Sequence, residues 1–314
     1  MWPFRSKDSP APPTELRKSS RGILSARSIG LLGAYKESPN SVYTVVCQDN
    51  DYASGKGGAR NSSSGRIVLL SGSKILWERA CQRPNDGQVA DNGTVAVADW
   101  LFTEDLSSKL VAYDVQGTLL LEQKFSANAF NIGLSLDGRF AAIQLCNSST
   151  DDSSTLSVFD LQAGHRLGRF RPVTGWANGY EFDGAARTIS LIYRNGRAYR
   201  FSFDGTFLDN ERYQNERVAD AGPTELVLIV RERREDATNV DPQQLLELLD
   251  SSWAQGLENY PDYLAIAHRL RGELREQLGQ FEAAAAAYRL ALALNSKIGV
   301  KKKLAALEKR LGSK

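Results

Sequence analysis

The sequence predicts a β domain of repeated antiparallel units followed by a smaller α-helical domain. Three turns, Asp91-Asn92-Gly93, Leu136-Asp137-Gly138 and Phe182-Asp183-Gly184, lie 45 and then 46 residues apart, and each is followed by a strand-like run. A motif that recurs at this interval is typical of arrays built from four-stranded units. From Asp241 onward the apolar residues recur at helical spacing instead.

Four units can be outlined from β-branched and aromatic residues that alternate with polar ones between Gly, Asp and Asn turns. The third unit is the clearest, and the first is less regular. In chain order the expected strands are 28–35, 42–48, 66–70 and 74–79; 88–90, 94–99, 109–114 and 118–124; 130–135, 139–145, 155–160 and 166–170; and 178–182, 187–193, 197–202 and 206–209.

A second mark recurs at the end of the third strand of three units. Tyr113-Asp114, Phe159-Asp160 and Phe203-Asp204 each place an aromatic residue before an aspartate. This ending resembles that of WD-type repeats, and Leu136–Phe140 resembles the turn of related bacterial β-propellers. The resemblance covers about residues 28–212 and lacks the Gly-His dipeptide of true WD repeats, because Gly164-His165 falls in another hairpin.

The fold class expected from the resemblance is a propeller-like array of four four-stranded antiparallel blades. The sequence leaves open whether four blades close into a ring, stay open or need a second chain, and a β-sandwich remains an alternative.

A helical hairpin is expected near the end of the chain. Asp241-Pro242 predicts a helix start, because aspartate caps the first turn and proline at the first helical position loses no hydrogen bond. The stretch 278–295, with Gly272 before it and Ala284, Tyr288 and Ala291 within it, resembles a tetratricopeptide repeat over about residues 265–298. The expected helices are 242–258, 263–278, 281–294 and 300–311.

These patterns divide the chain into three parts. Residues 1–27, rich in Ser, Pro, Lys and Arg, are expected to form a flexible basic leader. Residues 28–235 form the β domain and residues 236–314 the helical domain. The run 224–231 is compatible with a strand or a short helix, since periodicity does not distinguish the two over so few residues.

Composition narrows the function classes. With 39 basic and 37 acidic residues the net charge is +2, which makes nucleic acid an unexpected partner. The three cysteines lack the spacing of a disulfide framework or a zinc site, so no metal or cofactor is expected and a reducing, cytoplasmic location is favoured. No segment is apolar over a membrane-spanning length.

The loops carry the candidate binding residues. The loops that connect the second and third strands are long in three units, and they are expected to share one face of the array. Unequal loops on a rigid scaffold are typical of a recognition surface, and their acids suit a basic partner. The candidate loop-face residues are Asp49, Asp51, Trp100, Glu104, Asp105, Asp151 and Asp152; on the helical arm they are Arg271 and Arg275.

The sequence therefore predicts a non-enzymatic protein–protein interaction scaffold, with unidentified protein partners and self-association left open. Neither His165 nor His268 has a second ligand or nucleophile at a suitable spacing, so no catalytic residue is assigned. The alternative is a hydrolase or lyase with carboxylates at the centre of the propeller, which fold analogy alone supports.

Overall fold

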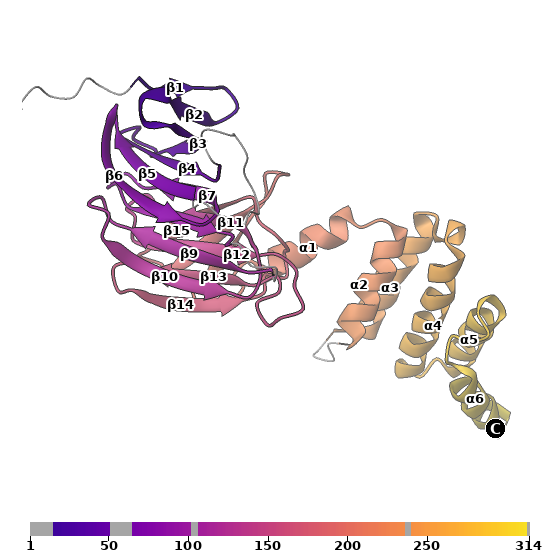
Figure 1. The fold of residues 1–314 in the computed structure, drawn as a ribbon. Helices are drawn as coiled ribbons and strands as arrows, with labels where there is room; N and C mark the ends of the chain where they lie inside the picture. Colours follow the sequence, from indigo (N-terminus) through magenta and orange to yellow (C-terminus); the bar gives the residue numbers. More distant parts are fainter. Residues whose placement is uncertain (1–14, 51–64, 102–105, 236–239, 313–314) are drawn as a thin grey trace, which may run out of the picture. The chain divides into compact units, whose positions relative to one another are not determined.

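The structure is a computed structural model that describes residues 15–50, 65–101, 106–235 and 240–312. The chain forms two compact units, Met1–Asp209 and Asn210–Lys314 (Figure 1). The first is built from antiparallel sheets and the second from helices. The boundary thus lies earlier than the expected position at residue 235, because the segments just before that position are helical.

The first sheet has six strands rather than the four expected. In spatial order they are β1 (Arg17–Lys18), β2 (Ile23–Ala26), β3 (Leu31–Glu37), β4 (Tyr43–Gln48), β5 (Gly65–Ser71) and β6 (Lys74–Cys81). The short strands β1 and β2 come from the segment expected to be a flexible leader. That expectation is wrong for residues 15–27, since Leu24 and Ala26 are buried; residues 1–14 lie outside the described chain.

The next three sheets follow the predicted units. The second contains β7 (Pro84–Val89), β8 (Val95–Asp99), β9 (Ser108–Tyr113) and β10 (Leu119–Phe125); the third contains β11 (Ala129–Leu134), β12 (Phe140–Leu145), β13 (Leu156–Asp160) and β14 (His165–Phe170). The fourth has three strands, β15 (Gly179–Asp183), β16 (Thr188–Ile192) and β17 (Ala198–Ser202). Its expected fourth strand is reduced to one bridge, between Phe201 and Phe207.

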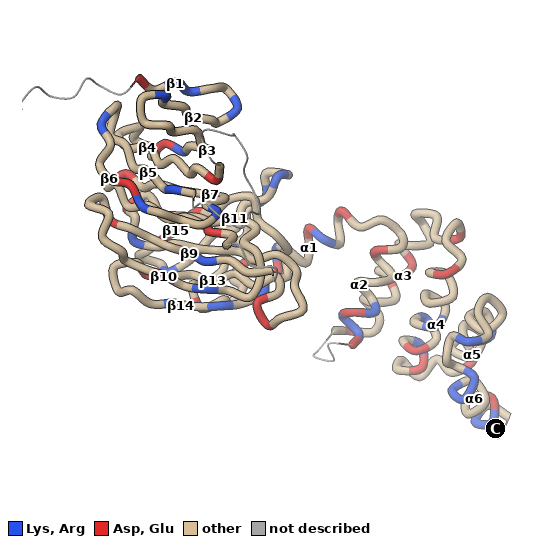
Figure 2. The backbone as a smooth tube through the Cα atoms, in the orientation of Figure 1, with Lys and Arg blue, Asp and Glu red and all other residues tan. Residues whose placement is uncertain are grey.

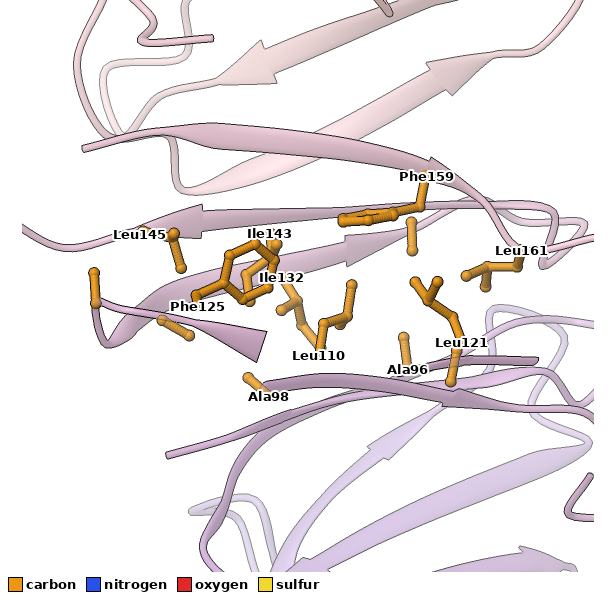
Figure 3. Packing of buried hydrophobic residues seen from close by; sticks show 14 residues of the cluster. Ala96, Ala98, Leu110, Leu121, Phe125, Ile132, Ile143, Leu145, Phe159 and Leu161 are labelled. Atoms are coloured by element: carbon orange, nitrogen blue, oxygen red, sulfur yellow. The ribbon is translucent and has the colours of Figure 1, made fainter. Parts of the chain in front are cut away.

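The four sheets form a propeller-like array in which each sheet packs on the next along the chain. Strand β4 contacts β7, β7 and β8 contact β11, and β11 contacts β15. Between the second and third sheets, alanines on one side face larger side chains on the other, as Figure 3 shows for Ala96, Ala98, Ile143 and Phe159. Small residues opposite large ones let two sheets interdigitate at the density of a protein interior.

The two ends of the array differ in chemistry. On the first sheet, Val46, Val68 and Leu70 point away from the second sheet and are fully buried with Leu24 and Leu31, so the sheet's own N-terminal strands cover that face. The outward face of the fourth sheet is polar instead, with Glu181, Asp183 and Arg200 exposed. Among the main contacts of the described elements, none joins the fourth sheet to the first.

Helices make up the second unit. They are α1 (Asn210–Asp220), α2 (Pro223–Glu235), α3 (Pro242–Ala254), α4 (Pro261–Gln277), α5 (Phe281–Leu294) and α6 (Lys301–Gly312). The run 224–231 is therefore helical, and it lies in α2, where Val227 and Val230 join the core of α3 and α4. The predicted helix start is confirmed, since the Asp241 carboxylate accepts from the Gln243 backbone N–H at 3.0 Å.

Helices α4 and α5 approach closely at a glycine. A Cβ atom built on Gly272 would lie 2.4 Å from the ring of Tyr288, which is itself fully buried. The hydroxyl of Tyr288 donates to the carboxylate of Glu276 at 2.7 Å. The pair Gly272 and Tyr288 therefore sets the spacing of the two helices.

Candidate interaction surfaces

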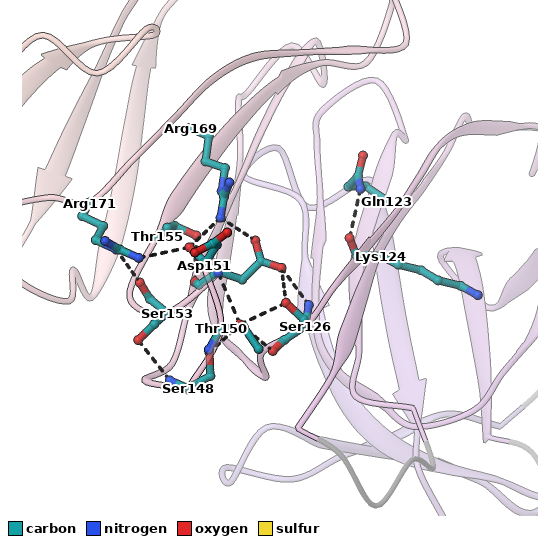
Figure 4. Close-up of polar contacts among 11 residues, drawn as sticks. Gln123, Lys124, Ser126, Ser148, Thr150, Asp151, Ser153, Thr155, Arg169 and Arg171 are labelled. Atoms are coloured by element: carbon teal, nitrogen blue, oxygen red, sulfur yellow. Dashed lines mark hydrogen bonds and ion pairs between the residues drawn. The ribbon is translucent and has the colours of Figure 1, made fainter.

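The loop between β12 and β13 is held in place by Asp152. One oxygen of its carboxylate accepts from the backbone N–H and the hydroxyl of Ser126, at 2.7 and 2.9 Å, and the other pairs with Arg169 at 2.9 Å. Figure 4 shows Arg169 and Arg171 reaching this loop, where both donate to the backbone oxygen of Asp151. Asp152 thus stabilises the loop, while the Asp151 side chain is exposed.

The other predicted loop-face residues are only partly described. Asp49 forms an ion pair with Arg83 at 3.9 Å, and the Arg83 guanidinium lies over the ring of Trp100. Trp100 packs against the core between the second and third sheets, so much of its ring is covered. The remaining candidates lie outside the described residues: Asp51, Glu104 and Asp105.

An exposed aromatic pair lies beside the end of β12, where the loop that carries Asp151 and Asp152 begins. Phe130 and Trp176 are 40% and 43% exposed, and their rings stack with centroids 5.6 Å apart. The indole N–H of Trp176 donates to the backbone oxygen of Leu145, at the end of β12, over 3.2 Å. Val173 is also exposed, and it lies with Trp176 in the connection between β14 and β15. Sequence analysis missed this pair, because its two members are far apart in the chain.

Two described carboxylates, Asp86 and Asp99, lie near Cys47 of the first sheet. Asp99 is buried and accepts from the backbone N–H groups of Gln82, Arg83 and Leu101, so it fixes the crossing from the first sheet to the second. Burial raises the pKa of Asp86, and its carboxylate accepts from the Ile132 backbone N–H at 3.4 Å. Within the described ranges, no group of three or more His, Cys, Asp or Glu residues could hold a metal ion.

The two arginines predicted for the helical arm have different surroundings. The guanidinium of Arg271 lies 3.7 Å from the centroid of the Trp253 ring and pairs with Asp250. Trp253 also contacts the ring of His268, and burial together with Arg271 lowers the pKa of that histidine. Arg275 is partly buried, and its Nε makes no hydrogen bond with the described residues.

A basic hollow of about 430 Å³ lies elsewhere in the helical unit. Helix α2 supplies Arg231, Arg234 and Glu235, helix α4 supplies Ile266, Arg269 and Leu270, and the segment after α5 supplies Asn295, Lys297 and Ile298. Figure 2 shows basic residues on α2 and α4, with acidic ones among them. These nine residues form the basic hollow. No sequence motif marks it, because its cations come from three separate segments.

Comparison with known proteins supports no closer assignment. No protein-family model and no curated protein sequence matches the chain. Among solved structures it is similar to the β-propeller domain of Cps50 (Swd1) from Myceliophteria thermophila, at 10% identity and a TM-score of 0.37, over 54% of this chain and 53% of that one. It is also similar to BamB from Moraxella catarrhalis, at 13% identity and a TM-score of 0.36, over 55% and 47%.

The chain therefore spans about half the length of each of these structures. Because these TM-scores are low, the propeller-like character of the β domain is concluded from its own strands and sheets. In the part of the chain that the structure describes, no helix has the length and apolar character needed to cross a bilayer.

Proposed function

We propose that the chain is a non-enzymatic scaffold that binds partner proteins through the loop face of its β domain and through its helical arm. The observation that carries the proposal is the stacked, exposed pair of Phe130 and Trp176. Aromatic side chains are enriched where binding energy concentrates in protein interfaces, because they bury large areas with few rotatable bonds.

The surroundings of the aromatic pair are preorganised. Trp176 is anchored to Leu145, and the neighbouring loop is fixed by Asp152 and Arg169. A surface whose side chains are already ordered loses little conformational entropy when a partner docks. The described loop-face candidates Asp49, Trp100, Asp151 and Asp152 belong to the proposal as the polar rim and support of this surface.

The helical arm is proposed to be tetratricopeptide-like. The close approach of Gly272 and Tyr288 supports this, since such repeats pair helices at small residues. Arg271 and Arg275 stay in the proposal as partly exposed residues of α4. A cytoplasmic location is also proposed, supported by free thiols at Cys47, Cys81 and Cys146.

The enzyme alternative rests on Asp86, because its carboxylate accepts few hydrogen bonds from the described residues. Its raised pKa is a feature that functional and structural carboxylates share. Asp99, the other buried acid near Cys47, already accepts three backbone N–H groups. Glycoside hydrolysis, for example, uses two carboxylates that face each other across a substrate, so one available group favours the scaffold.

Affinity capture from source-cell lysate tests the proposal with three forms of the full chain. They are the wild type, the double variant Phe130→Ser/Trp176→Ser, and Leu119→Ser, a control that removes an exposed apolar side chain from β10. A protein retained by the wild type and the control but lost with the double variant supports the loop face. Equal capture by all three forms contradicts it, and capture of only a second copy of the chain makes the surface a self-association site.

A further inference from the structure

The basic hollow has an excess of positive charge. Four of its nine residues are cationic, Arg231, Arg234, Arg269 and Lys297, and only Glu235 is acidic. The adjoining carboxylate of Glu273 is 4% exposed and pairs with Arg234 at 2.8 Å and with Arg269 at 3.3 Å. Since Lys303 also pairs with Glu273 at 2.8 Å, three cations share one carboxylate. Among the described residues, the hollow therefore keeps more positive than negative charge.

Part of this hydrogen-bonding capacity is unused. The side chains of Arg231 and Lys297 make no hydrogen bond or ion pair with any described residue, and the Nε of Arg234 is buried without an acceptor. Arg231 and Lys297 are exposed and hydrated, so the free-energy cost of a buried donor without an acceptor applies to the Arg234 Nε alone, and a bound acceptor would recover it. The three donors come from different segments, α2 and the turn after α5, that meet at the same hollow.

The helical spacing shows that α2 and α4 each contribute one face to the hollow. Arg231, Arg234 and Glu235 lie at positions i, i+3 and i+4 of α2, and Ile266, Arg269 and Leu270 repeat that spacing on α4. Residues at this spacing share one face of a helix. Two helix faces thus oppose each other, with the backbone of Ile298, which accepts from Arg269 at 3.3 Å, closing one side.

The apolar residues restrict the class of anion. Ile266, Leu270 and Ile298 contribute aliphatic surface beside the cations. A free phosphate or a nucleic-acid backbone would leave this surface in contact with water or with charge. None of the nine described lining residues is aromatic, so none of them could stack on a base. A peptide with carboxylate side chains on either side of an aliphatic one satisfies both kinds of lining at once.

We propose that the basic hollow binds an acidic peptide segment of a partner protein, with carboxylates on Arg231, Arg234 and Lys297 and an aliphatic side chain against Ile266 and Leu270. Glu273 is an internal example of the interaction, because it shows a carboxylate held between Arg234 and Arg269. The inference rests on the proposed scaffold function and names the ligand chemistry of its helical arm.

Fluorescence polarisation with the full chain tests the proposal. The probe is a labelled, capped peptide Asp-Glu-Leu-Glu-Asp, and the matched peptide Asn-Gln-Leu-Gln-Asn keeps its shape without the charges. The binding variant is Arg231→Gln/Lys297→Gln, which changes two exposed side chains without a hydrogen bond or ion pair to the described residues. The control is Lys301→Gln/Lys302→Gln, which removes the same charge from exposed residues of α6.

The acidic peptide is expected to bind the wild type saturably. The affinity of the binding variant for this peptide should be lower by about tenfold or more, since charge-assisted hydrogen bonds are stronger than neutral ones. The control pair should change the affinity less than about twofold, and replacing the central leucine by serine should weaken it several-fold. Circular dichroism of both variants verifies that the helices are intact.

Four outcomes overturn the proposal. They are no saturable binding, equal binding of the neutral peptide, equal loss in the control variant, and stronger competition by inorganic phosphate or duplex DNA than by the unlabelled peptide. None of these outcomes affects the capture experiment with Phe130 and Trp176, so a failure of the hollow and a failure of the scaffold are distinguishable.

Discussion

The side-chain amide of Asn92 donates to the backbone oxygen of Asp137 over 2.7 Å and links two successive turns of the array. The Asp91 N–H donates in parallel to Leu136 at 3.0 Å, and Asn40 joins the preceding turn to Asp91. Asp137 stands where Asn92 does one repeat earlier, but its carboxylate has no proton to donate and accepts from Ser135 and Arg139 instead. No such hydrogen bond is described between the turn at Asp137 and the next turn at Asp183. A pocket of about 500 Å³, lined by Asp137, Phe182 and Gly184 among others, lies at this position.

Replacing Asn92 by aspartate is expected to lower the free energy of unfolding by about 1–2 kcal/mol, because a hydrogen bond is lost and a carboxylate then faces the oxygen of Asp137. Urea unfolding of the full chain at neutral pH measures the change. Asn195→Asp is the control, since Asn195 caps its own turn through its side-chain oxygen, which aspartate retains. Equal losses in the two variants would show that the hydrogen bond between the two turns contributes no stability beyond that of an ordinary turn residue.

Removing the Asp152 side chain is expected to loosen the loop between β12 and β13. Asp152→Ala leaves Arg169 and Ser126 without their shared acceptor, so limited proteolysis should cut residues 146–154 faster and stability should fall by about 1 kcal/mol. Asp151→Ala is matched to it, because the hydrogen bonds described for Asp151 are made by its backbone oxygen, which alanine retains. Cleavage at the same rate in both variants would contradict the role given to Asp152.

Gly272→Ala is expected to force α4 and α5 apart. The added methyl group would lie 2.4 Å from the Tyr288 ring, and overpacking of this kind costs about 1–3 kcal/mol. Thermal unfolding followed by circular dichroism should show the loss in the helical transition. Gly222→Ala, at a site with no atom within 4 Å of the added Cβ, should leave that transition in place. An unchanged midpoint for Gly272→Ala would mean that the helices can shift at little cost.

The helical unit is expected to lose stability as the pH falls below about 6.5, the ordinary pKa of histidine. Burial, with a smaller effect from Arg271, lowers the pKa of His268 in the folded state, so the neutral form is favoured there. The stability that the neutral His268 contributes is fully present above the pKa of histidine in the unfolded chain. It is lost as the pH falls through the lower pKa of His268 in the folded state. Chemical denaturation at pH 7.5 and pH 5, on the wild type and His268→Gln, measures it; an identical pH dependence in both would contradict the assignment.

Local sequence patterns predicted the elements whose stability is local. The strands of the third unit, the start of α3 at Asp241 and the extent of α5 all follow from turn residues, capping residues and periodicity within a few positions. Strands β1 and β2 escaped prediction because they lie in or next to a segment rich in Ser, Pro, Lys and Arg, which has the composition of a solvated segment. Their pairing depends on the apolar face of a sheet that lies later in the chain.

The sequence by itself determined the order of the elements, the repeated turns and the division into sheets followed by helices, since each depends on neighbours in the chain. Only the tertiary structure decided that 224–231 is helical, because burial of Val227 and Val230 against α3 and α4 settles what a short apolar run leaves open. It alone brought Phe130 to Trp176 and Arg231 to Lys297. Such surfaces depend on packing between segments that are distant in sequence, and the spacing of residues along the chain does not predict that packing.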